Sequence, residues 1–371
     1  QKTRQWWNSY WKRSYVFIDS GKIGSDYWKV GRNYQLFRYM LGCNAYGSEP
    51  TKFNGGLFTF DPVHIDSTRV FTPDFRLWGG GTMTAQNQRL VYFPMLKSGD
   101  FDMMKPQFDF YERMLDNAKL RTKVYWNHGG ACFSEQIENF GLPNLAEYDW
   151  KPRHEGFPIG VDSNPWLEYT WDTALEFALM MFDAHLYNNE PIVPHLPFIE
   201  SLLTFFDEHY SYLALRRGTN KLDGDGHLVL YPGSACETYK MATNATSTVA
   251  ALKVITEKLL ELPELDATQR EHWSGFLKRI PPISHREVQG KKTISPAKMW
   301  ERINNSEVPS LYPVYPWRIY GIGQPELQTA INTYLYDPEA IEFRSHIGWK
   351  QDNIFAACLG LTEEAERLTL L

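Results

Sequence analysis

The stretch WDTALEFALMMFDAHL, residues 171–186, indicates the fold most directly. Trp171, Leu175, Leu179, Phe182 and Leu186 recur at every third or fourth position, which places them on one face of a helix. The same spacing returns along the chain and predicts a protein built mainly from helices. The expected helices cover residues 30–41, 101–118, 171–186, 198–216, 249–262, 266–279, 325–335 and 352–370.

Long segments rich in Gly, Pro and aromatic residues separate these helices, at 44–82, 126–170, 217–245 and 280–320. Loops of this length in a compact domain are usually functional, or else the assignment of elements within them is wrong. The β-prone residues 227–231 predict a short strand within one of them. The helices do not repeat at a fixed short period, which argues against a regular solenoid. Helix pairs whose connecting loops gather on one face favour a helical toroid.

The amino-acid composition limits the classes of ligand that the protein is expected to bind. Aromatic residues make up 15% of the 371 residues, and some stand beside glycines and polar groups, as in residues 75–81. Flat apolar rings next to hydrogen-bonding groups suit sugars. The net charge of -6 provides no electrostatic footprint for nucleic acid. The sequence contains no uncharged apolar stretch of about 18 residues, so no membrane span is expected.

The cysteines and histidines point to neither a metal nor a cofactor. Cys43, Cys132, Cys236 and Cys358 are widely spaced and form no CxxC pair. Free thiols are favoured over two disulfide bridges. No spacing of His, Asp or Glu is typical of a tight metal site. The Gly-Ile-Gly sequence at 321–323 lacks the third glycine of a dinucleotide-binding loop.

One glutamate has the surroundings of a general acid. Cleavage of a glycosidic bond needs one carboxyl group that donates a proton and a second that activates water or attacks directly. Glu237 lies in LVLYPGSACETY, residues 228–239, after the β-prone segment and a Pro-Gly turn. Its neighbours are small or aromatic, and Lys240 is the one close cation in the sequence. Such surroundings raise a carboxyl pKa, whereas the alternative for a loop glutamate is a solvated charge.

Residues 228–237 resemble the segment that carries the catalytic acid in glycoside hydrolase family 95, whose founding members are 1,2-α-L-fucosidases with an (α/α)6 barrel. Four further stretches resemble the family in the same order. Residues 37–57 resemble its first barrel helix and the following loop, and residues 84–94 resemble its water-activating segment. Residues 311–316 resemble its Leu-Tyr-Gly-Leu-Tyr-Pro loop, and residues 348–349 resemble the start of its penultimate barrel helix. The resemblance is collinear over about residues 30–371. Cys236 and Ala85 replace a Pro and an Asn of the family, which indicates a distant branch.

The resemblance implies an (α/α)6 barrel over residues 27–371, with short β-hairpins in its loops. Residues 1–26 would form a linker helix from an N-terminal β-domain, and further β-structure would follow the barrel. The barrel would be incomplete at its C-terminal end. The family's general base, an Asp, is then expected beyond residue 371, so the chain alone should be inactive or nearly so.

The resemblance also implies the site residues. Glu237 would be the acid, and Asn87 would aim the attacking water, with Gln86 as a substitute for the missing second Asn. Trp78 would line the sugar pocket, with a flexible turn as the alternative. The remaining expected substrate contacts are His128, Glu135, Trp349 and Asp352. For His128 and Glu135 the alternative is loop solvation. Asp352 superficially resembles the family's base, but its register places it on the preceding helix.

The expected function is inverting exo-hydrolysis of a terminal α-linked sugar, L-fucose or L-galactose, from a plant or host oligosaccharide or polysaccharide. The resemblance further implies a secreted or periplasmic location. Two other classes stay open. A polysaccharide lyase would need cations to hold a uronate beside a base such as Tyr239 or His128, and a non-catalytic relative would only bind sugar.

Overall fold

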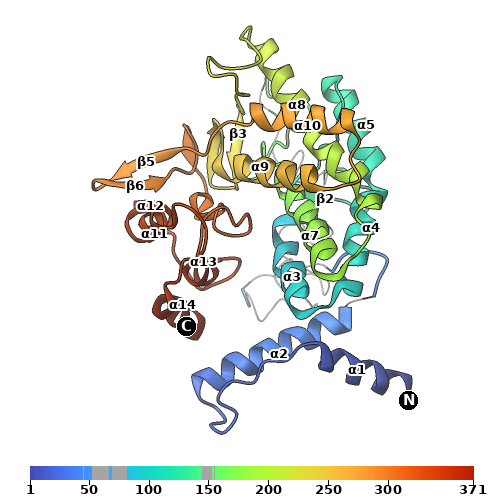
Figure 1. The fold of residues 1–371 in the computed structure, drawn as a ribbon, viewed down its shortest axis with the longest axis vertical. Coiled ribbons are helices and arrows are strands. Elements are labelled where there is room, and N and C mark those ends of the chain that lie inside the picture. The colour runs from blue at the N-terminus through green and yellow to red at the C-terminus, as the bar shows by residue number, and fades with distance from the viewer. Residues whose placement is uncertain (45, 52–66, 69–81, 144–152, 154) are drawn as a thin grey trace.

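The computed structural model describes residues 1–44, 46–51, 67–68, 82–143, 153 and 155–371, so Trp78 lies outside the described residues. Within them the chain is mostly helical, as the periodicity predicts, and its strands form small antiparallel sheets (Figure 1). The helices are α1 (Lys2–Arg13), α2 (Asp26–Asn44), α3 (Ala85–Ser98), α4 (Lys105–Arg113), α5 (Leu115–Trp126), α7 (Thr173–Asn188), α8 (Leu196–Arg216), α9 (Thr246–Glu261), α10 (Ala267–Arg279), α11 (Leu327–Tyr336), α12 (Pro338–Glu342), α13 (Asp352–Cys358) and α14 (Thr362–Leu370).

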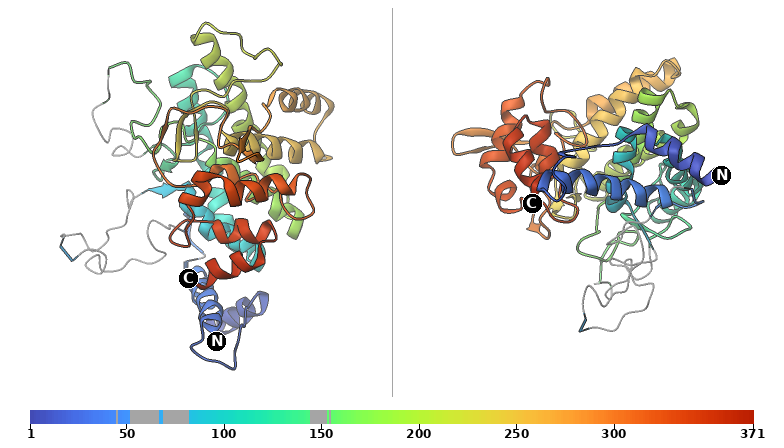
Figure 2. Two further views of the ribbon diagram at one scale, coloured as in Figure 1. Left: turned by 90° about the vertical axis from the view of Figure 1, so that its left-hand side faces the viewer. Right: turned by 90° about the horizontal axis from the view of Figure 1, so that it is seen from below.

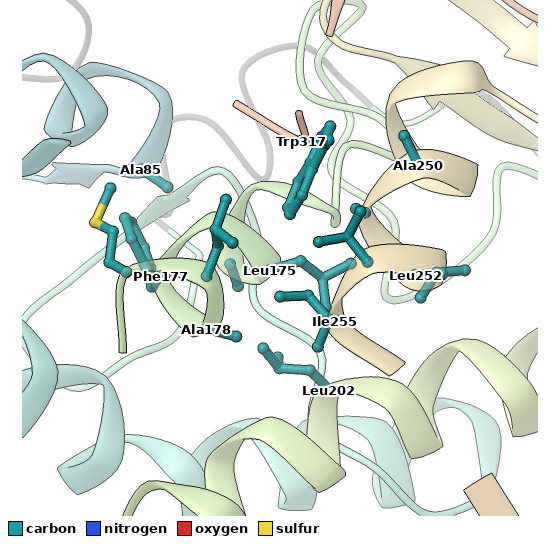
Figure 3. Close-up of a cluster of buried hydrophobic side chains, with 14 of the residues drawn as sticks. Ala85, Leu175, Phe177, Ala178, Leu202, Ala250, Leu252, Ile255 and Trp317 are labelled. Carbon is teal, nitrogen blue, oxygen red and sulfur yellow. The ribbon is translucent and has the colours of Figure 1, made fainter. Parts of the chain in front are cut away.

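Helix α7, which contains the stretch quoted first, forms the centre of the core. It contacts α3, α8 and α9, and every residue from 173 to 184 is buried. Figure 3 shows Leu175 of α7 near Leu202 of α8 and Ile255 of α9. A helix surrounded on several sides buries its polar positions too. Two acids off the predicted apolar stripe, Glu176 and Asp183, therefore form ion pairs, with Arg89 and Arg318.

Two predicted helices are divided in the structure. The stretch 101–118 splits into a 3-10 turn, α4 and the first part of α5, with Pro106 in the first turn of α4. The stretch 352–370 splits into α13 and α14, because Gly360 between them has a φ of 77°, which a right-handed helix cannot continue through. The start of α10 agrees with prediction, since Asp266 forms a capping box with Gln269.

Two of the small sheets join loops that are distant in sequence. Strand β1 (Met83–Thr84) pairs with β2 (Gln136–Ile137), and β5 (His285–Val288) forms a hairpin with β6 (Lys291–Ile294). The third sheet has the order β3-β4-β7, from Gly233–Ala235, Tyr239–Ala242 and Arg302–Ile303. The predicted strand at 227–231 is reduced to one isolated antiparallel bridge, between Leu228 and Leu222. Its backbone bonds elsewhere: Leu228 N–H donates to the carbonyl of Arg279, and Leu230 N–H to the side chain of Asn244.

The N-terminal helices pack on the body through aromatic side chains and a buried ion pair. Tyr10 of α1 is fully buried, and Trp7 contacts Gly42 of α2 so closely that a side chain there would clash. Arg38 of α2 binds the buried carboxylate of Asp100 at 2.8 Å. Figures 1 and 2 show α1 and α2 (blue) beneath the body, with the C-terminal helices α11–α14 (red) beside it. The origin of residues 1–26 in a linker stays a prediction.

All four cysteines are free thiols, as predicted. Cys132 and Cys236 are buried, Cys358 is half-buried and Cys43 is exposed. Within the described residues, no helix combines the length and the apolar character needed to cross a lipid bilayer.

Candidate active site

A cavity of about 440 Å³ opens where the β1–β2 ladder, the β3–β4 hairpin and the loops after Asn164 and β7 meet. Its lining combines amides, two indole rings and one carboxyl group. The described lining residues are Thr84, Gln86, Asn87, Gln136, Asn164, Trp166, Leu167, Glu237, Asn305 and Trp349. Amides that donate and accept hydrogen bonds, set beside flat apolar rings, match the hydroxyl rim and the C–H face of a sugar.

Glu237 is placed by the turn that joins β3 to β4. Ala235 pairs with Tyr239 across the hairpin, so Cys236, Glu237 and Thr238 form its tip. Cys236 has a φ of 51°, in the left-handed region that a tight turn requires. The hydroxyl of Ser234 donates to the carbonyl of Cys236 and closes the turn from inside. The hairpin therefore presents the Glu237 side chain to the cavity.

The surroundings of Glu237 favour its protonated form. Burial, and then the charge of Glu307, raise the pKa of Glu237 from 4.5 to about 7. Lys240, Arg89 and a hydrogen bond of 2.9 Å from the amide of Asn305 to Oε2 act in the opposite direction. A carboxyl group that titrates near neutral pH can donate a proton to a leaving oxygen under physiological conditions.

Gln86 and Asn87 reach the cavity from the first turn of α3. Their helix starts where β1 pairs with β2, and two backbone N–H groups of that first turn bind Glu135. Ala85 N–H donates to the carbonyl of Glu135 at 2.9 Å, and Gln86 N–H donates to its carboxylate. A carboxyl group suits this position, because the N-terminus of a helix leaves N–H groups unpaired. Glu135 thereby sets the start of α3 and the direction of both amides.

Three of the predicted substrate contacts lie apart from the described cavity lining. Glu135 is fully buried, and burial followed by the charge of Glu237 raises its pKa well above the usual range. The ring of His128 hydrogen-bonds His209 at 2.9 Å. Asp352, the first residue of α13, is buried and accepts a bond from the N–H of Ser345. Among the predicted site residues, Gln86, Asn87, Glu237 and Trp349 are those that the structure brings together.

Sequence reasoning missed much of the wall. Gln136, Asn164, Trp166 and Asn305 line the cavity without having been predicted. A signal was present for some of them. Asn305 belongs to the polar run 304–307 just before the stretch that resembles the family's Tyr-Pro loop, and Trp166 lies in one of the long loops expected to be functional. Nothing in the sequence indicates which residues of these loops come together.

Lys240 fixes the wall that carries Trp166. Its ammonium group is buried in β4 and lies within hydrogen-bond distance of the carbonyls of Trp166 and Glu168, at 2.5 and 3.2 Å. It also reaches the hydroxyls of Thr170 and Ser234, at 3.1 and 2.7 Å. Burial lowers the pKa of Lys240 to about 8. One cation therefore ties the Trp166 segment to the hairpin that carries the acid.

A second group of polar side chains lies outside this lining. Asp223, Asp225 and His227 bring their ligand-type atoms within 4.8 Å of one another on a surface turn. The carboxylate of Asp223 accepts the backbone N–H groups of Asp225 and His227, at 3.0 and 2.9 Å. These bonds explain the cluster as the closure of an Asx-type turn.

Neither a scan of the sequence against models of known protein families nor a search of curated proteins finds a match. The resemblance to glycoside hydrolase family 95 therefore rests on the segments quoted for it.

Proposed function

We propose that the protein is an inverting glycoside hydrolase that removes a terminal α-linked sugar, with Glu237 as the proton donor. The observation that carries the proposal is the position of Glu237. Its carboxyl group, with a pKa raised to about 7, lines a cavity whose other described walls are mostly amides and indole rings. In this mechanism Glu237 protonates the glycosidic oxygen as its bond to the anomeric carbon breaks.

The attacking water would be held by Asn87 and activated by a second carboxylate. Asn87 lies in the same cavity, and the adjacent Gln86 supplies another amide. Glu237 is the only carboxyl group among the described residues that line the cavity. The resemblance places the base, an Asp, beyond residue 371. An inverting enzyme needs the two carboxyl groups roughly 6.5–9.5 Å apart, with room for a water between them.

A neutral sugar fits this cavity better than a uronate. Among the described lining residues, no side chain is a lysine, an arginine or a histidine. A polysaccharide lyase holds the carboxylate of its substrate with such cations. The buried ammonium group of Lys240 contacts four oxygen atoms of the protein, so it holds the cavity wall together and does not serve to bind a substrate carboxylate. By resemblance, the sugar is L-fucose or L-galactose and the helices close into an (α/α)6 ring in a secreted or periplasmic protein.

The test is a glycan-release screen with the full-length protein, in which proton NMR identifies the anomer formed first. We expect an inverted sugar from the wild type and almost none from Glu237→Gln. A retained anomer would contradict inversion. An unsaturated product that absorbs ultraviolet light would assign a lyase instead, and equal turnover by both proteins, or none by either, would favour a sugar-binding relative.

A further inference from the structure

Glu307 is a buried carboxylate that the proposed mechanism leaves unused. It follows β7 in the polar run 304–307 and is only 4% exposed. Two donors reach its Oε1: the side-chain amide of Gln86 and the hydroxyl of Tyr312. Its Oε2 accepts the backbone N–H of Glu237 at 3.3 Å. Arg89 lies 4.0 Å from Oε1, so the carboxylate has both hydrogen-bond donors and a cation to stabilise its charge.

The loop that carries Glu307 is fastened to the turn that carries Glu237. Asn304 N–H donates to the carbonyl of Thr238 at 2.8 Å. Glu307 N–H donates to the hydroxyl of Thr238 at 3.0 Å. Together with the bond from Glu237 N–H, these contacts join the two segments through backbone groups at three points. The spacing between the two glutamates is therefore set by the fold.

We propose that Glu307 is a positioning residue of this site: its buried carboxylate holds both the Glu237 turn and the Gln86 amide in place, and its negative charge keeps the proton on Glu237. This inference rests on the proposed role of Glu237 as proton donor. Two like charges close together in a buried site cannot both form easily. More hydrogen-bond donors reach the carboxyl group of Glu307 than reach that of Glu237, so Glu237 is the group that stays protonated.

The other groups that act on Glu237 come from four segments of the chain. Glu135, before β2, lies close enough to interact with the Glu237 charge. Lys240 of β4 and Arg89 of α3 favour the ionised form of Glu237, as does the amide of Asn305. Glu307 is the first among the charged groups that oppose ionisation of Glu237, after burial itself. Its removal should therefore shift the Glu237 titration in a defined direction.

The test compares Glu307→Gln with Asn305→Ala in the full-length protein. Loss of the Glu307 charge should lower the Glu237 pKa and move the alkaline limb of the kcat/KM profile to lower pH, by about one unit. Loss of the Asn305 amide should move it to higher pH, because that amide stabilises the ionised form. Glu307→Asp keeps the charge and should leave the limb close to that of the wild type, which also guards against a folding defect in Glu307→Gln.

A direct readout separates this inference from the proposed function. In protein labelled with carbon-13 at the glutamate carboxyl, the Glu237 resonance is identified by its absence from Glu237→Gln and followed by NMR against pH. Opposite shifts in the two variants support the positioning role, even if no glycan is released by the wild type, in which case the hydrolase proposal alone fails. An unchanged Glu237 titration in Glu307→Gln, or shifts of the same sign in both variants, would overturn it.

Discussion

The wall of the cavity and the buried charged residues next to it differ in the charge of their side chains and in what those side chains contact. The wall presents neutral amides and indoles, and Glu237 is its one described carboxyl group. The neighbouring group, here called the charge cluster, consists of five buried residues: Arg89, Lys240, Glu135, Glu176 and Glu307. In the cluster every named residue has a protein partner, whereas the wall faces an open space. The difference separates residues that would touch a ligand from residues that fix the others in place.

This division gives mutations in the two regions different expected effects. A change in the wall should alter turnover or affinity and leave the fold intact, because the side chain borders open space. A change in the cluster should alter stability, because it leaves a buried charge without its partner.

The largest effect is expected from Glu237→Gln. Removal of a general acid lowers kcat by about 10²–10⁴-fold, whereas the melting temperature should not fall below that of the wild type, since Glu237 lines the cavity and its amide replacement keeps the shape. The measurement is steady-state kinetics on the released sugar together with a thermal melt. Glu287→Gln, an exposed site on β5, is the matched control and should leave both quantities unchanged. Equal losses in both variants would remove Glu237 from the mechanism.

The next effect concerns stability. Arg89 is 4% exposed and binds Glu176 at 2.9 Å and the hydroxyl of Tyr312. Arg89→Met should lower the free energy of unfolding by about 3–5 kcal/mol, because it leaves buried carboxylates without their cation. Urea denaturation measures this loss. Lys29→Met, which breaks an exposed pair with Asp26, should change it little. Similar losses in the two variants would mean that the charge cluster does not depend on its pairs.

Most of the helical core could be predicted from the sequence because most of its helices carry their own periodicity, but α3, which is buried along most of its length, was not among the predicted helices. The stripe in 171–186 predicted α7, and the expected helix 266–279 agrees with α10 and its N-cap. The predictions failed where distant partners decide the structure. Residues 227–231 have the composition of a strand, yet the N–H group of Leu228 bonds to Arg279 and that of Leu230 to Asn244, outside the segment.

The site was predictable only in part for the same reason. Glu237 stood out by its small and aromatic neighbours, and Gln86 and Asn87 by the resemblance. Asn305 and Trp166 are ordinary loop residues in the sequence, and they become wall residues only because β7 pairs with β4 and Lys240 binds the Trp166 carbonyl. Contacts between segments that are far apart in the chain do not produce a local sequence pattern from which they could be predicted.

A smaller effect is expected at the rim of the cavity. Trp166 is 40% exposed, so its ring is available to stack on a sugar. Trp166→Ala should raise KM by about two- to tenfold with a smaller change in kcat, since a lost stacking contact removes about 0.5–1.5 kcal/mol. Phe17→Ala, at a ring that is 70% exposed near the N-terminus, is the control and should leave KM unchanged. A fall in kcat with a constant KM would assign Trp166 to the chemical step rather than to binding.

The most gradual effect is a slope in stability against pH. The pKa of Glu237 is raised from 4.5 to about 7 in the folded state. Between these values the folded protein binds more protons than the unfolded chain, so this carboxyl group's contribution is fully present below pH 4.5 and is lost as the pH rises through about 7. The slope from one group is at most about 1.4 kcal/mol per pH unit. Urea unfolding at several pH values should therefore show Glu237→Gln gaining stability relative to the wild type as the pH rises. Parallel curves for the two proteins would mean that Glu237 titrates alike in the folded and unfolded states, and the wall would then hold an ordinary carboxylate.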